Sequence, residues 1–197
     1  MDLRHLLAHE VAAGIIATGI EGAYDSVSCS TAGNYHSMGV SQWEGGRGDN
    51  LLSWIDDGRK FIGRTYSDIV DSGELPELRA VLDSEQGRAA QLEILAADCL
   101  DYVDALMPYI SDSKCVIYAG MWCPTSTNVV RVFVRNRKNR GYDVDDLSAL
   151  AAVFEDEYYV AAAVGTAYKQ GYANRARATY NYLAGHDIDW GLLKDKL

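Results

Sequence analysis

The longest helical pattern in this 197-residue chain runs from Arg88 to Ile110. Its apolar residues recur at spacings of three and four, the repeat of one buried face of an α-helix. These residues are Leu92, Leu95, Cys99, Val103, Leu106 and Ile110. Because such a face must be covered by other elements, we expect this helix to lie at the centre of a mainly α-helical fold.

Shorter helical patterns flank this segment. A helix is expected to begin behind the capping pair Asp49 and Asn50, and Pro76 is expected to interrupt another. The expected ranges are 3–19, 51–62, 67–82, 147–154 and 161–183. The secondary structure of residues 116–134 is ambiguous, because their apolar run fits a strand or a helix. A cap at Ser126 or Thr127 favours a helix.

Composition limits the classes of function. With 48% hydrophobic residues, the chain can bury one sizeable core, and we expect a single domain over residues 1–197. A net charge of −10 argues against a general nucleic-acid-binding protein. No apolar run is long enough for a transmembrane segment, and the charged N-terminal helix is unlike a signal peptide.

The first helical pattern ends at an acidic residue, Glu21. The following residues, 22–47, are rich in glycine and serine and lack helical periodicity, which predicts loops around a two- or three-stranded hairpin. This stretch contains the compact unit from Ser37 to Trp43, with Gln42 beside the tryptophan. A carboxylic acid that faces a hairpin with hydroxyl, amide and aromatic groups suits acid catalysis on a sugar polymer.

The segment from Ile20 to Leu52 resembles the lysozyme-like catalytic domain of endolysins from phages of Gram-positive bacteria. The resemblance rests on the Glu, the S-x-G-x-x-Q-W unit some twenty residues later, and the following G-x-R and Asn-Leu-Leu. It is more distant to goose-type lysozymes and lytic transglycosylases, and it extends weakly over residues 10–184. It implies a mainly α (α+β) lysozyme-like fold of two helical lobes, with a small β-hairpin beside the cleft.

The resemblance also implies an activity. The chain would cleave the β-1,4 link between N-acetylmuramic acid and N-acetylglucosamine in peptidoglycan glycan strands, with Glu21 as the general acid. Ser37 and Gln42 would hold an N-acetyl group or the nucleophile. The rings expected to stack on sugars are Trp43, Tyr35 and Tyr118. Such a protein would be made in the cytoplasm of the bacterial host without a signal peptide and would act on the cell wall.

A second carboxylate would place the attacking water. Related sequences often carry an acid near positions 30–33, but this chain has Ser-Thr-Ala-Gly there. Asp25, Glu44 and Asp49 are the candidates left around the hairpin. Two reactions stay open: hydrolysis, or a lytic transglycosylase reaction in which a sugar hydroxyl replaces water. A non-catalytic wall-binding or virion protein of the same fold is a third possibility.

Three further patterns favour ordinary structural roles. His5 and His9 stand four apart without a third ligand, so we expect no metal site and no cofactor. The four cysteines lack metal spacing and are expected to be reduced, with a Cys115–Cys123 bridge as the alternative. Five basic residues between Arg131 and Arg140 predict a solvated helix face, or else contact with anionic wall groups.

Overall fold

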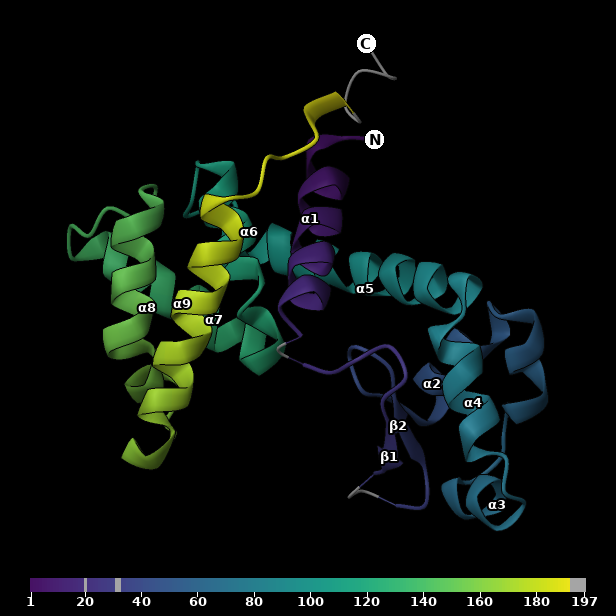
Figure 1. Cartoon of the computed structure of the whole chain (residues 1–197). Coiled ribbons are helices and arrows are strands. Elements are labelled where there is room, and N and C mark those ends of the chain that lie inside the picture. Colours follow the sequence, from purple (N-terminus) through teal and green to yellow (C-terminus); the bar gives the residue numbers. More distant parts are fainter. Residues whose placement is uncertain (20, 31–32, 192–197) are drawn as a thin grey trace. The chain divides into compact units, whose positions relative to one another are not determined.

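The computed structural model describes residues 1–19, 21–30 and 33–191. The fold is mainly helical and contains a small three-stranded antiparallel sheet, as predicted (Figure 1). The chain divides into two compact units, one formed by Met1–Thr18 with Ala96–Leu197, the other by Gly19–Leu95. Within the described part of the chain, no helix is both long and apolar enough to span a membrane.

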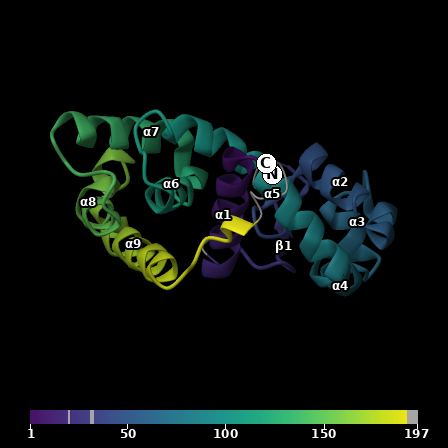
Figure 2. The ribbon, with the colours of Figure 1, turned by 90° about the horizontal axis from the view of Figure 1, so that it is seen from above.

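The first unit contains helices and loops, and no strand among its described residues. It contains α1, the C-terminal part of α5, and α6 to α9, with a short 3-10 helix, η2, before α9. Figures 1 and 2 both show α8 and α9 side by side. The bounds are α1 Leu3–Thr18, α5 Glu85–Leu106, α6 Ser113–Gly120, α7 Cys123–Asn139, α8 Leu147–Ala161, η2 Thr166–Tyr168 and α9 Lys169–Ala184.

An aromatic cluster forms the core of this unit. The Trp122 ring, which is fully buried, lies 5.0 Å from the Phe154 ring and 4.9 Å from the Tyr158 ring, measured between centroids. Phe133 of α7 packs edge-on against Phe154 at 4.9 Å. Such aromatic pairs contribute about 0.5–1.5 kcal/mol each beyond the area that they bury, so this cluster ties α7 and α8 together.

The second unit holds the sheet and five helical segments. Strands β1 Val27–Cys29, β2 His36–Met38 and β3 Trp43–Glu44 pair antiparallel in the order β1-β2-β3. The register places Ser28 opposite Ser37 and Ser37 opposite Glu44. The helices are α2 Gly45–Ser53, η1 Asp56–Phe61 (a 3-10 helix), α3 Tyr66–Asp71, α4 Leu75–Asp83 and the N-terminal part of α5.

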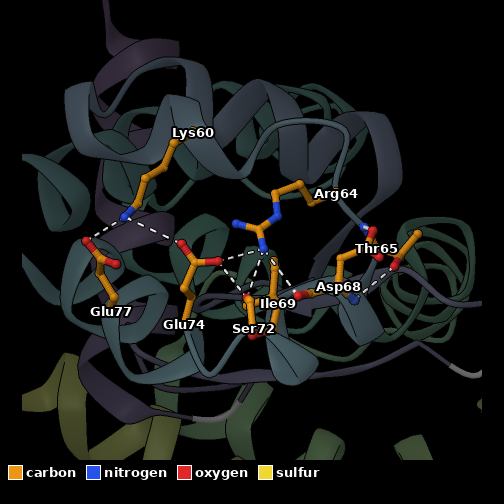
Figure 3. A network of polar contacts seen from close by, with 8 residues as sticks. All are labelled: Lys60, Arg64, Thr65, Asp68, Ile69, Ser72, Glu74 and Glu77. Carbon is orange, nitrogen blue, oxygen red and sulfur yellow. Dashed lines mark hydrogen bonds and ion pairs between the residues drawn. The ribbon is translucent and has the colours of Figure 1, made fainter.

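A polar network stabilises the short helices of the second unit (Figure 3). Glu74, which precedes α4, accepts contacts from Arg64 at 2.6 Å and from the Ser72 hydroxyl at 2.6 Å. The hydrogen bond from Arg64 and that from Ser72 lower the pKa of Glu74 to about 2. Lys60 of η1 reaches Glu77 of α4 at 2.5 Å, so the network joins η1 to α4.

The predicted starting point of the helix after the hairpin is wrong. Helix α2 begins at Gly45, immediately after β3, and not behind Asp49 and Asn50. Pro76 does not interrupt a helix either, because it lies in the first turn of α4, where its missing N–H costs no hydrogen bond. The break between α3 and α4 lies instead near Gly73, which has a φ of 75°.

Residues 113–139 resolve the strand-or-helix ambiguity in favour of helix. They form α6 and α7, and every residue of α6 from Cys115 to Gly120 is buried. A helix buried on all sides shows no amphipathic period, which is why its sequence resembled a strand. Ser126, one of the predicted caps, is a kink with extended backbone within α7, and its hydroxyl accepts a hydrogen bond from the Val129 N–H at 3.4 Å, the contact of an N-cap.

The thiol groups are all reduced, so the alternative Cys115–Cys123 bridge is wrong. Cys29 is exposed, whereas Cys99, Cys115 and Cys123 are buried. Burial raises the pKa of these three thiols, that of Cys123 to about 12. Since only the thiolate reacts readily, only Cys29 should be labelled quickly in the native protein.

We therefore expect iodoacetamide to label one cysteine per native chain and all four in denaturant, as counted by mass spectrometry of the intact protein. The variant Cys29→Ser should show no rapid native labelling. Rapid native labelling of two or more thiols would contradict the burial described above.

Candidate functional site

Glu21 follows closely on α1, which ends at Thr18. Gly19 has a φ of 61°, a left-handed conformation common just after a helix. The Glu21 side chain is partly exposed, but its Oε1 atom is shielded from solvent. The acid is therefore placed at the beginning of the second unit, with one oxygen sheltered by the protein.

The chain beside Glu21 packs directly on the hairpin. A Cβ atom at Gly22 would lie 3.0 Å from the Gly39 carbonyl oxygen and 3.1 Å from Nε2 of Gln42. Such contacts are tighter than ordinary van der Waals contact, so the hairpin turn would have to shift by a few tenths of an ångström to admit a side chain at position 22. The contact brings the backbone next to Glu21 against the turn that carries Gln42, as the spacing of the two sequence segments had suggested.

Ser37 and Gln42 are hydrogen-bonded to each other. The Ser37 hydroxyl lies 3.0 Å from Oε1 of Gln42, and Nε2 of Gln42 donates to the Gly39 carbonyl at 3.1 Å. Gln42 also has a φ of 51°, in the left-handed region that costs a non-glycine residue about 1–3 kcal/mol. Ser37 is buried, so its main contact is with Gln42, whereas the partly exposed Gln42 can meet a ligand.

The three candidate carboxylates differ in their surroundings. Asp25 and Glu44 are exposed, and the sheet register places Glu44 directly opposite Ser37. Residues paired in this way have Cβ atoms about 4.5–5.5 Å apart. Asp49 is partly buried and accepts a hydrogen bond from the Gly63 N–H at 3.0 Å, so it has a structural contact. Asp25 and Glu44 are therefore the better candidates to hold water.

Two of the three predicted sugar-stacking rings are buried, which corrects the sequence-based interpretation. Trp43 is 2% exposed and packs near Gly39, so neither ring face is open to a sugar. Tyr118 belongs to the other unit, is fully buried in α6, and donates to the Ala176 carbonyl at 3.4 Å. Burial also raises its pKa. Tyr35, which is 53% exposed, retains a ring that a ligand could contact.

Sequence reasoning missed Gln91, the polar residue that holds this region together. It lies on α5, is fully buried, and accepts a hydrogen bond from the Val40 N–H at 3.0 Å. Its only signal in the sequence is its position four residues before Leu95, on the face of the helix where the other residues are apolar. A buried amide is costly unless it is hydrogen-bonded, so a polar residue on such a face marks a specific contact.

His36 lies beside Ser37 in β2, with both ring nitrogens shielded from solvent. Burial lowers its pKa from the usual 6.5, although the charge of Asp49 opposes the shift. Below about pH 6.5 the unfolded chain therefore binds a proton that the folded histidine resists. This difference in proton binding favours the unfolded chain. The free energy of unfolding therefore decreases as the pH falls from about 6.5 to the lower pKa of the folded state.

We accordingly expect thermal unfolding of the His36→Gln variant to depend less on pH between 7.5 and 5 than that of the wild type. Calorimetry at several pH values measures both. If His36→Gln and wild type showed parallel pH profiles, protonation of His36 would not be coupled to folding.

The remaining sequence patterns do not join this site. His5 contacts Asp2 at 2.7 Å, and the described residues contain no group of three or more His, Cys, Asp or Glu side chains that could hold a metal ion. The basic run lies at the C-terminal end of α7. Arg137 within it is largely buried, because it pairs with Glu157 and lies 4.8 Å from the Phe133 ring. It is therefore a packing residue and not part of a solvated face.

Comparison with known proteins adds no relative: no family model matches the chain, and neither a curated protein nor a solved structure matches it. The function must therefore be argued from the site itself. The site combines a partly sheltered carboxylic acid with an amide, a buried hydroxyl and nearby exposed carboxylates. Such a set can donate a proton, hold a sugar amide and orient a water molecule.

Proposed function

We propose that this protein is a peptidoglycan-degrading glycosidase that cleaves the β-1,4 link between N-acetylmuramic acid and N-acetylglucosamine. A lysozyme-like fold, action on the cell wall and synthesis in a bacterial host are parts of the same proposal. The observation that carries it is the packing of Gly22 on the Gly39 carbonyl and the Gln42 amide. This packing sets the backbone next to Glu21 against the turn that carries Gln42, and these two segments are the parts on which the resemblance to endolysins rests.

In the proposed reaction Glu21 protonates the oxygen of the leaving sugar. The partly exposed Glu21 side chain, with its Oε1 atom shielded from solvent, suits this role, since a general acid must reach the substrate oxygen to transfer its proton. Gln42 would bind an N-acetyl group by hydrogen bonds, oriented by Ser37 at 3.0 Å. Asp25 or Glu44 would hold the attacking water, and the exposed Tyr35 ring would contact a sugar face.

Purified, metal-free cell walls test the proposal directly. The wild-type protein should reduce the turbidity of a wall suspension and release new reducing sugar ends, because each glycosidic hydrolysis creates one. It should do so without added metal or cofactor. A protein that binds walls but neither lowers their turbidity nor releases reducing ends after long incubation would be a wall-binding or virion component, and the proposed activity would be wrong.

A further inference from the structure

The Gln91 side chain hydrogen-bonds both the segment after Glu21 and the hairpin turn. It occupies the buried face of α5 that also carries Leu95 and Cys99. An apolar residue at this position would pack without any hydrogen bond. The presence of an amide there therefore needs a reason beyond filling space.

Every polar atom of the Gln91 side chain is used. Oε1 accepts from the Val40 N–H at 3.0 Å, and Nε2 donates to the carbonyls of Leu82 at 2.9 Å and Tyr24 at 3.3 Å. The three backbone groups belong to three separate segments: the hairpin turn, the end of α4, and the chain three residues beyond Glu21. One side chain thus fixes the separation of segments that are far apart in sequence.

The neighbouring glycine shows how closely this contact is fitted. Gly39 has a φ of 71°, and a Cβ atom there would lie only 2.4 Å from Oε1 of Gln91. The Gly39 carbonyl accepts the hydrogen bond from Nε2 of Gln42, and it is also the atom on which Gly22 packs. A shift of Gln91 would therefore move the partner of Gln42 and the support of the segment next to Glu21.

We propose that Gln91 is a positioning residue, which sets the distance between the Glu21 segment and the Gln42 turn. The inference rests on the proposed function, because it names what holds the parts of that site. The role needs an acceptor and two donors on one flat group, which only an amide of this length supplies. An ionised glutamate would accept but could not donate to the Leu82 and Tyr24 carbonyls.

The variant Gln91→Glu tests the proposal with almost no change in volume. A carboxyl group offers these two carbonyls no donor when ionised and at most one when protonated, so kcat on soluble peptidoglycan fragments should fall about tenfold or more with KM changed less than twofold. A displacement of about 1 Å can cost 10²-fold in rate.

A matched control lies on the same helix. Gln86 is exposed, and its Oε1 accepts from the Asp56 N–H at 3.1 Å, a bond that glutamate preserves. Gln86→Glu should therefore keep the wild-type kcat and pH profile. If Gln91→Glu fails to fold, Gln91→Met replaces it as the test variant, because methionine fills similar space without making hydrogen bonds. Circular dichroism gives the folded fraction, so that kcat is expressed per folded molecule.

Hydrogen exchange supplies a readout that does not depend on activity. The Val40 amide should exchange faster in Gln91→Met than in wild type, while amides in the other unit stay unchanged. Folded Gln91 variants with wild-type kcat per folded molecule and unaltered Val40 exchange would overturn the inference. Failure of the proposed function is recognised separately, since the wild-type protein itself would then leave glycan strands uncut.

Discussion

Replacement of Glu21 by glutamine is expected to reduce wall lysis by about 10²–10⁴-fold, the usual contribution of a general acid. The amide retains the shape of the side chain and loses only the transferable proton. The melting temperature should stay close to that of the wild type, because the residue is partly exposed and lies outside the cores. Turbidity of a purified wall suspension measures the rate, and circular dichroism measures the fold.

The matched control is Glu77→Gln. Glu77 lies in the same unit and pairs with Lys60 on the surface, so its loss should leave lysis within about twofold of wild type. If Glu21→Gln lysed walls at more than half the wild-type rate, Glu21 would not be the acid. A loss of lysis accompanied by unfolding would likewise remove support for a chemical role.

The largest loss of stability is expected for Trp122→Ala, at about 3–5 kcal/mol for removal of a buried tryptophan. The ring is fully buried among aromatic residues, and the guanidinium of Arg175 lies 5.0 Å above it. Truncation would leave a cavity that α7 and α8 can fill only by moving. Denaturant unfolding followed by circular dichroism measures the difference.

Trp190→Ala controls for the loss of a tryptophan in the same unit. Trp190 is 46% exposed, so its truncation should cost less than about 1 kcal/mol. Equal destabilisation by the two substitutions would contradict the description of Trp122 as the centre of the aromatic core.

Helices with one apolar face were predictable from the sequence. The stripe from Leu92 to Ile110 located α5 within a few residues, because three- and four-residue spacing follows directly from helix geometry. Helix α6 was ambiguous because it is buried on all sides and carries no polar face. The start of α2 was missed because its first turn contains two glycines, which usually indicate a loop.

The site was predictable only in its local part. The short spacing from Ser37 to Gln42 makes their contact a property of one hairpin, and the structure shows that contact. Burial of an aromatic ring depends on segments far away in sequence, so Trp43 and Tyr118 could not be assigned to the core from their identity alone. Gln91 stands about fifty residues from Val40, and no local pattern joins the two.

The central claim is that the protein hydrolyses a glycosidic bond, and the products decide it. Purified walls are digested to completion, and the soluble muropeptides are analysed by mass spectrometry with and without borohydride. The account predicts disaccharide muropeptides that end in reducible N-acetylmuramic acid and whose formation requires Glu21. Products lighter by one water, with 1,6-anhydro ends that borohydride leaves unchanged, would instead mean that Glu21 acts in a transglycosylase. Fragments released only by peptide cleavage would contradict the glycosidase assignment altogether.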